Sequence, residues 1–152
     1  MKNFRLIKSQ GKEVVEVVNV EGELDQNTTY YFNLTKNEFM KNDRYDGQLK
    51  IERILFSPAN LPKYHINRND CTITLAKDLR CFRNELRLES ERFTTDDNLL
   101  DSNFKVKMNG YAVASSKYVN EAMEVTMIQN EYEVELLYIC IVAFCVKYNL
   151  LK

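Results

Sequence analysis

The stretch EYEVELLYICIVAFCVKYNLLK, Glu131–Lys152, decides the fold of this chain. Its central part, from Leu136 to Val146, contains no polar break. As a helix this part is about 16 Å long, whereas the core of a bilayer is about 30 Å thick and requires about 20 residues. We therefore predict no transmembrane segment. A helix that is apolar on every side but too short to cross a membrane belongs in the middle of a globular core.

Signals at both ends of the stretch favour a helix over a strand. Asn130 is a good N-cap, and Glu133, three residues later, can complete a capping box. Glu131, Glu133 and Glu135 place negative charge at the positive end of a helix dipole, and Lys147 lies near the other end. We expect the helix to begin directly after Asn130.

The residues from Asn3 to about Ile128 have the composition of β structure. Runs rich in Val, Ile, Tyr, Phe and Thr are separated by Gly, Asn and Asp at intervals of roughly ten residues. The expected strands are Phe4–Lys8, Glu13–Val20, Thr28–Leu34, Gln48–Phe56, Tyr64–Ile66, Cys71–Leu75, Arg80–Glu89 and Ala122–Ile128. Asp46-Gly47 is expected to form a turn, and Ser57–Pro62, which contains both prolines, a loop or sheet edge.

The clearest hairpin is Phe104–Ser115. Asn109-Gly110 predicts a two-residue type I′ turn, because both residue types tolerate positive φ. In that register the facing pairs are Met108 with Tyr111, Val106 with Val113 and Phe104 with Ser115. Lys105 and Lys107 then project from the other face, beside Ala112 and Ala114.

These elements predict a mainly β (α+β) protein. A chain of 152 residues is ordinarily one domain, so we expect a single domain over residues 1–152. About ten or more short antiparallel strands followed by one apolar helix imply a closed or nearly closed antiparallel β-barrel threaded by its central hydrophobic C-terminal α-helix. Because the helix fills the interior, any ligand is expected on the outer face or the rim loops.

Charge and cysteine content restrict the function. The 21 Lys and Arg residues balance 22 Asp and Glu residues, so no global charge attracts nucleic acid or an anionic membrane. The four cysteines, Cys71, Cys81, Cys140 and Cys145, show no CxxC spacing, and MKNFRLIKSQ lacks the apolar region of a secretory signal. We therefore expect a cytoplasmic protein that does not bind nucleic acid.

No catalytic, cofactor or metal site is predicted. His65 is the single histidine, so pairing with Cys71 or Cys81 has no supporting pattern, and a half-buried strand histidine is the simpler interpretation. The acidic stretch TTDDNLLD, with Asp96, Asp97 and Asp101, lacks the spacing of a calcium loop and is interpreted as a surface loop. The aromatic run Tyr30–Phe32 is assigned to the core.

Two segments resemble the LURP-one-related family. FKVKMNGYAVASSKYVNEAMEVTMIQNEYEVELLYICIVAF is similar to the end of that family, whose hairpin pattern F-x-V/I-x-x-x-G-x-x-V/I-A is matched by Phe104, Val106, Gly110, Val113 and Ala114. IERILFSPANLPKYHINRNDCTITLAKDLRCFRNELRLES resembles the preceding repeat. The resemblance covers roughly Leu49 to the end and is weaker in the N-terminal third, where some family turn glycines are missing. It implies the Tubby C-terminal-like fold, a barrel of about 12 strands around a central helix.

The resemblance also implies a function at membranes. Tubby-like domains bind phosphoinositides through basic residues on the barrel surface, and the related scramblases act at membranes. Lys105 and Lys107 are the best local candidates for such a surface, although ordinary solvated strand lysines remain the alternative. We therefore expect a non-enzymatic binding module that associates peripherally with anionic phospholipid or phosphoinositide head groups. The alternative is a protein-interaction module, such as a small bacterial regulatory or immunity protein.

Overall fold

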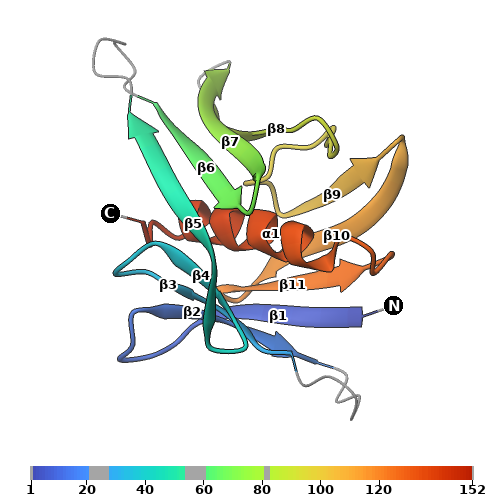
Figure 1. Cartoon of the computed structure of the whole chain (residues 1–152). Coiled ribbons are helices and arrows are strands. Elements are labelled where there is room, and N and C mark those ends of the chain that lie inside the picture. Colours follow the sequence, from blue (N-terminus) through green and yellow to red (C-terminus); the bar gives the residue numbers. More distant parts are fainter. Residues whose placement is uncertain (1, 21–27, 54–60, 81–82, 152) are drawn as a thin grey trace.

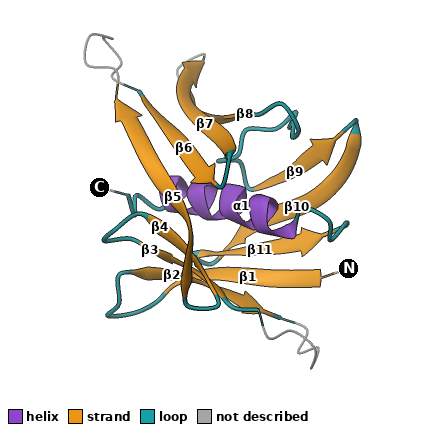
Figure 2. Ribbon diagram, in the orientation of Figure 1, coloured by secondary structure: helices purple, strands orange, loops and turns teal. Residues whose placement is uncertain are grey.

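The computed structural model describes residues 2–20, 28–53, 61–80 and 83–151, which form one antiparallel sheet and one helix (Figures 1 and 2). The sheet order is β8-β7-β6-β5-β4-β3-β2-β1-β11-β10-β9. The elements are β1 (Lys2–Lys8), β2 (Val14–Asn19), β3 (Tyr30–Asn33), β4 (Glu38–Lys41), β5 (Arg44–Arg53), β6 (Pro62–Arg68), β7 (Cys71–Arg80), β8 (Arg83–Glu89), β9 (Asn103–Met108), β10 (Tyr111–Val119), β11 (Ala122–Met127) and α1 (Glu133–Lys147).

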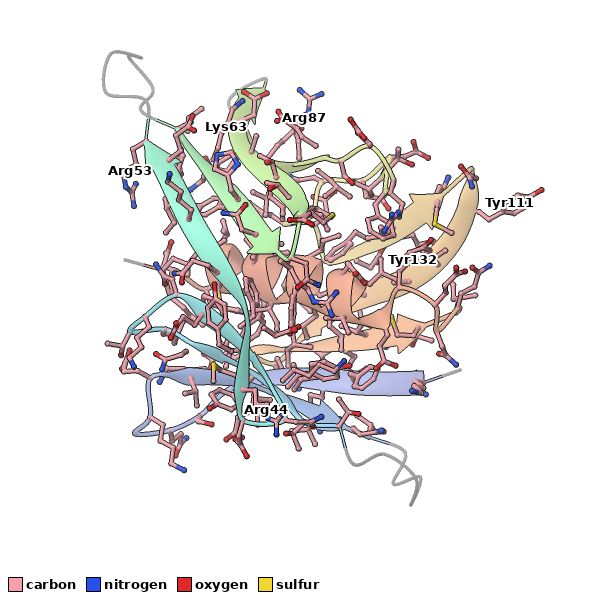
Figure 3. All side chains as sticks on the ribbon, viewed as in Figure 1. Arg44, Arg53, Lys63, Arg87, Tyr111 and Tyr132 are labelled. Carbon is pink, nitrogen blue, oxygen red and sulfur yellow. The ribbon has the colours of Figure 1, made fainter. Side chains whose placement is uncertain are left out.

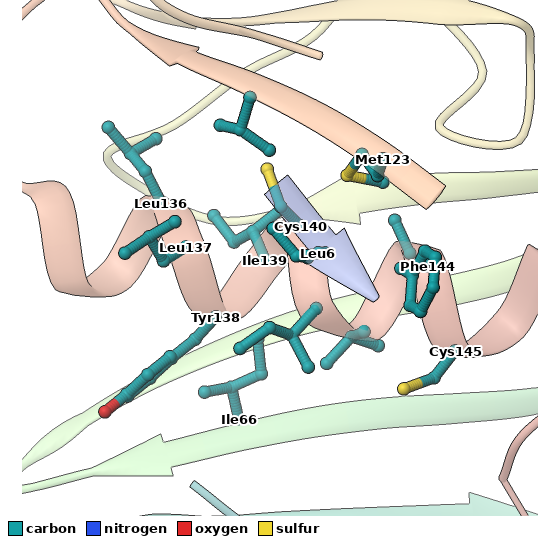
Figure 4. Close-up of a cluster of buried hydrophobic side chains, with 14 of the residues drawn as sticks. Leu6, Ile66, Met123, Leu136, Leu137, Tyr138, Ile139, Cys140, Phe144 and Cys145 are labelled. Carbon is teal, nitrogen blue, oxygen red and sulfur yellow. The ribbon is translucent and has the colours of Figure 1, made fainter. Parts of the chain in front are cut away.

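Helix α1 lies inside the curve of the sheet, with strands on several sides of it (Figure 1). Every residue from Leu136 to Val146 is buried, and Figure 4 shows Leu6, Ile66 and Met123 packed around it from three different strands. Burying each such side chain contributes about 1.5–3 kcal/mol. The prediction of a central apolar helix is confirmed. In the described part of the chain, no helix is long and apolar enough to cross a membrane.

The predicted capping box at the start of α1 is wrong. The N-cap is Tyr132, without a side-chain cap, and Asn130 contributes only its carbonyl oxygen, which accepts the Glu133 N–H at 3.4 Å. The Glu133 carboxylate instead contacts Lys2 Nζ at 3.0 Å and accepts the Tyr30 hydroxyl at 3.0 Å. The Glu133 carboxylate therefore bonds to side chains of distant strands and does not form the local cap.

The prediction of a closed barrel with about 12 strands is not confirmed. The described residues form an 11-stranded sheet whose edge strands, β8 and β9, are not joined by a ladder. Instead, the chain that connects β8 to β9 runs between these two edge strands. We call residues 94–99 of this connection the closing segment, because they bind both edges.

On the β9 side, the closing segment bonds to two residues of the edge strand. Thr94 and Lys107 exchange backbone hydrogen bonds of 2.9 and 2.7 Å. The Thr95 hydroxyl donates to the Lys105 carbonyl at 2.7 Å, and the Lys105 N–H donates to Asp97 Oδ2 at 2.9 Å. These bonds occupy backbone groups that an edge strand would otherwise offer to another chain.

On the β8 side, the same segment bonds through Asn98 and Leu99. The Leu86 N–H donates to Asn98 Oδ1 at 2.9 Å, Asn98 Nδ2 donates to the Asn84 carbonyl at 3.1 Å, and the Leu99 N–H donates to the Leu86 carbonyl at 3.1 Å. The stretch that the sequence suggested was an acidic surface loop therefore fills the seam of the sheet.

The β9–β10 hairpin confirms its predicted turn but not its whole register. Asn109 and Gly110 have φ values of 54° and 83°, and Met108 faces Tyr111. A bulge at Val113 then shifts the pairing. The facing pairs beyond it are Val106 with Ala114, Lys105 with Ser115 and Phe104 with Ser116. The bulge lets consecutive residues, Val113 and Ala114, both be buried, which strict alternation does not permit.

The predicted turn at Asp46-Gly47 is also wrong. The turn lies at Asn42-Asp43, with φ values of 52° and 60°, and β4 precedes it as a strand that the sequence did not reveal. Gly47 is inside β5, where a Cβ would approach the Asn67 carbonyl oxygen to 3.0 Å. This glycine permits close packing of two strands rather than a turn.

The central position of α1 makes a testable prediction. Replacing Ile141, which has no exposed surface, with Asp places an unpaired charge in the core. Its cost of several kcal/mol is comparable to a total stability of about 5–15 kcal/mol. Circular dichroism and size-exclusion chromatography should show that Ile141→Asp does not fold, whereas the control Ile128→Asp, at an exposed position, does. A folded Ile141→Asp protein would contradict the central helix.

The closing segment makes a second prediction. Asn98→Ala removes the side chain that bonds to Leu86, Asn84 and the Leu100 N–H, so unfolding in urea should show a loss of about 1–3 kcal/mol. Ser102→Ala, at an exposed position in the same connection, serves as the control and should leave the unfolding curve unchanged. If the two variants were equally stable, the bonds of Asn98 across the seam would contribute nothing to the free energy of unfolding.

Candidate functional site

The two predicted site lysines have different surroundings. Lys105 and Lys107 both point outward from β9, as the alternation of the strand predicts. Lys107 Nζ forms a 2.7 Å ion pair with Asp96 Oδ2 of the closing segment, and this hydrogen bond raises the pKa of Lys107. Lys105 is exposed and contacts the closing segment through its backbone. Lys107 is thus paired with a carboxylate of the closing segment through its side chain, whereas Lys105 contacts that segment through its backbone.

A different cation accompanies Lys105. Because of the bulge, Lys105 faces Ser115 on β10, and Lys117 lies two residues further along that strand. Lys105 and Lys117 are thus diagonal neighbours on one face, with a separation of about 7 Å between Cα atoms. The Lys117 side chain is 61% exposed, so both ammonium groups can approach a ligand from the same side.

Arg5 extends this set across two more strands. Arg5 on β1 faces Glu124 on β11, and Glu124 faces Lys117 on β10. The contacts are long: 3.5 Å from Arg5 Nη2 to Glu124 Oε1 and 3.7 Å from Lys117 Nζ to Glu124 Oε2. One carboxylate therefore serves two exposed cations, and Asp97, whose Oδ2 accepts the Lys105 N–H, lies beside the third. We call Arg5, Lys105 and Lys117 the basic face.

A shallow depression lies within the basic face. It has a volume of about 420 Å³, and its polar lining consists of Asn103, Lys105, Ser115, Ser116, Lys117, Glu124 and Thr126. Side-chain hydroxyl and amide groups beside ammonium groups can donate hydrogen bonds to phosphate oxygens. The arrangement is suited to holding an anionic group at the surface, and it contains no histidine or cysteine for nucleophilic or acid–base chemistry.

His65 does not pair with Cys71. Its Nδ1 lies 2.8 Å from Thr74 Oγ1 and its Nε2 lies 3.2 Å from Glu52 Oε2, both on neighbouring strands. The histidine is half-buried on the outer face of the sheet, as expected for a strand histidine. Cys81, the other cysteine considered as its partner, lies outside the described residues.

The remaining candidates have structural roles. Tyr30 and Phe32 are buried in the core, as predicted for that aromatic run, and Tyr31 is half-buried. Asp96 and Asp97 bind Lys107 and the backbone of Lys105. No group of three or more metal-ligating side chains occurs among residues 2–20, 28–53, 61–80 and 83–151.

A polar network surrounds the start of α1. Arg68 donates from Nε to Asp46 Oδ2 at 2.8 Å and from Nη1 to Glu135 Oε1 at 2.9 Å, and the Tyr138 hydroxyl donates to Asp46 at 2.6 Å. Burial raises the pKa of Tyr138, and the bond to Asp46 raises it further. The network ties β5 and β6 to the helix and is interpreted as an anchor.

Sequence reasoning found one member of the basic face and missed two. Lys105 was identified from the hairpin. Lys117 and Arg5 lie on strands whose register depends on the bulge at Val113 and on the pairing of β1 with β11. No local pattern encodes either feature, because the residues that meet are far apart in the sequence.

Comparison with known proteins gives no match: no family model, no curated protein and no solved structure is significantly similar to this chain. The resemblance to the LURP-one-related family therefore rests on the sequence segments alone. The functional interpretation rests on the geometry of the basic face.

Buried cysteine and tyrosine side chains along α1 and its neighbouring strands predict alkaline sensitivity. Burial raises the pKa of Cys140 to about 12, and it also raises the pKa values of Tyr30, Tyr118 and Tyr138. In the unfolded chain Cys titrates near pH 8.5 and Tyr near pH 10, so the unfolded state loses these protons first. The contribution of these four groups to the free energy of unfolding should be constant below about pH 8 and fall as the pH rises towards 12.

Urea unfolding at several pH values between 7 and 11 measures this dependence. Tyr138→Phe removes one of the titrating groups, so its stability, although lower at pH 7, should fall less steeply with pH than that of the wild type. Stability that does not change between pH 8 and 11 would contradict the prediction.

Proposed function

We propose that this protein is a non-enzymatic binding module that associates peripherally with anionic phospholipid or phosphoinositide head groups. The observation that carries the proposal is the basic face, where Lys105 and Lys117 line a polar depression on the outer surface and Arg5 faces Glu124, another residue of its lining. The interior is filled by α1, which supports binding on the outside.

The electrostatics of the basic face leave its cations available. The ion pairs of Glu124 with Arg5 and Lys117 are long and exposed, and such pairs contribute little to stability. A phosphate group can therefore replace Glu124 as the partner of either cation at small cost. Lys107 contributes less to the proposed site, because the 2.7 Å pair with Asp96 already occupies its ammonium group.

The sequence resemblance supports the same proposal. A sheet that curls around an apolar helix, with its seam filled by the closing segment, is compatible with a Tubby-like barrel of the LURP-one-related family. We propose that architecture for this chain, with a cytoplasmic location at the membrane surface. The argument from fold is an analogy, and the basic face supplies the specific chemistry.

Vesicle co-sedimentation tests the proposal. The wild type should bind vesicles of phosphatidylcholine with phosphoinositide, and binding should weaken with salt. Each basic residue near an anionic surface contributes about 1 kcal/mol, so the double variant Lys105→Glu/Lys117→Glu should bind at least about tenfold more weakly.

The matched control is Lys36→Glu/Lys50→Glu, which makes the same change in net charge at exposed positions on other strands and turns. It should bind like the wild type. Equal losses in both double variants would show that only net charge matters. An absence of salt-sensitive binding by the wild type would refute the lipid function.

A further inference from the structure

The depression in the basic face has different chemical groups on its two sides. Lys105 and Lys117 line it from β9 and β10, whereas Glu124 and Thr126 line it from β11. Tyr111 marks the tip of the β9–β10 hairpin in Figure 3, and the depression lies nearer the other end of this hairpin. One side of the depression therefore carries cations, and the other carries a carboxylate and a hydroxyl group.

The strand register makes these four lining residues a compact group. Lys117 faces Glu124 and Ser115 faces Thr126 across β10 and β11, and Lys105 faces Ser115 across β9 and β10. Neighbouring strands are about 4.8 Å apart, and residues two positions apart on one face of a strand are about 7 Å apart. A ligand that bonds to both lysines can therefore also reach Glu124 and Thr126.

The Thr126 hydroxyl group can accept a hydrogen bond from a ligand but cannot donate one to it. Its proton is already donated to Asn3 Oδ1, at a distance of 2.8 Å. A hydroxyl group has one donor and two acceptor lone pairs, so the Thr126 oxygen presents only lone pairs to the depression. An ionised phosphate oxygen, which is itself an acceptor, gains no hydrogen bond from this group.

Glu124 presents further acceptors. Its Oε1 lies 3.5 Å from Arg5 Nη2 and its Oε2 lies 3.7 Å from Lys117 Nζ. These two long contacts are the polar partners of its side chain within the part of the chain that the structure describes. An ionised carboxylate has about four lone-pair sites, so Glu124 retains vacant ones. When a phosphate group binds Lys117, Oε2 becomes free to accept a hydrogen bond from the same ligand.

A neutral hydroxyl group is the donor that fits Glu124 best. A phosphate group on the lysines and the Glu124 carboxylate repel each other, and a hydroxyl group of the ligand offsets this repulsion by donating to the charged acceptor. A ligand ammonium group could donate as well. However, Arg5 and Lys117 face Glu124 from the two neighbouring strands and repel a third cation. The acceptors on β11 therefore favour hydroxyl groups.

We propose that the basic face selects head groups that carry hydroxyl groups beside their phosphate, and that Glu124 and Thr126 determine this specificity. The phosphate bonds to Lys105 and Lys117, while the hydroxyl groups donate to Glu124 and to the Thr126 oxygen. Glycerol and inositol phosphates belong to this class, whereas serine, ethanolamine and choline head groups do not. The inference rests on the proposed function in that it uses the same face, but it concerns which anion is bound rather than whether that anion lies in a membrane.

Vesicles with two matched lipids test the specificity. Phosphatidylglycerol and phosphatidylethanol both carry a single phosphodiester charge, but only phosphatidylglycerol has free hydroxyl groups. At equal mole fractions in phosphatidylcholine, the wild type should bind the phosphatidylglycerol vesicles about tenfold more tightly, because it gains hydrogen bonds to the carboxylate and to the Thr126 oxygen.

Variants of the two acceptors should change this preference. Glu124→Ala should bind phosphatidylethanol vesicles more tightly than the wild type does, because the repelling carboxylate is gone, and its preference for phosphatidylglycerol should fall to about twofold. Glu124→Gln, which keeps an acceptor oxygen without the charge, and Thr126→Val, which removes the hydroxyl group, should each retain a preference of about threefold. The control Glu16→Ala removes a half-buried carboxylate of β2 that does not line the depression and should keep the wild-type preference.

A soluble measurement separates this inference from the membrane function. Calorimetry compares glycerol 3-phosphate with ethyl phosphate, which lacks hydroxyl groups. If the wild type prefers glycerol 3-phosphate but binds no vesicles, the lipid function is refuted and the specificity stands. Equal binding to both vesicle types, a wild-type preference in Glu124→Ala, or an equal loss of preference in Glu16→Ala would refute the specificity alone. Binding to neither vesicles nor soluble phosphates would refute both.

Discussion

The structure depends on one constraint, which is that α1 must be covered on every side. A helix with apolar residues only on one face could lie against a flat sheet, but Leu136–Val146 are all buried. The sheet therefore has to curl around the helix, and curling brings its two edges, β8 and β9, towards each other. The edges do not pair directly. The closing segment bonds to both, so the backbone groups of the seam are satisfied partly by the side chains of Thr95, Asp97 and Asn98.

The helix also needs a fixed axial position, because an apolar helix in an apolar environment has few interactions that define its register. The polar network at its start provides them. Glu133, Glu135 and Tyr138 each bond to a different strand through Tyr30, Arg68 and Asp46 respectively. These bonds have specific geometry, and their partly buried position strengthens them relative to exposed pairs. Hydrophobic burial thus stabilises the helix in the interior, while these hydrogen bonds determine its axial position.

The features that the sequence predicted correctly are those encoded by neighbouring residues. The apolar run, the alternating strands and the Asn109-Gly110 turn all depend on local spacing. The errors arose where distant residues compete with a local preference. Glu133 has the spacing of a capping box but bonds to Lys2 and Tyr30, and Gly47 has the composition of a turn but is needed for close strand packing. The closing segment lies on a path that no local pattern specifies.

The same reasoning explains why the candidate sites were only partly predictable. Lys105 and Lys107 share a strand face, and spacing alone makes them a pair. In the structure, Asp96 forms an ion pair with Lys107. The bulge at Val113 makes Lys117 the diagonal neighbour of Lys105. Because α1 fills the interior, selection for binding can act only on the outside, where side chains are not constrained by packing. The cations of the basic face lie on the outer face of β1, β10 and β9.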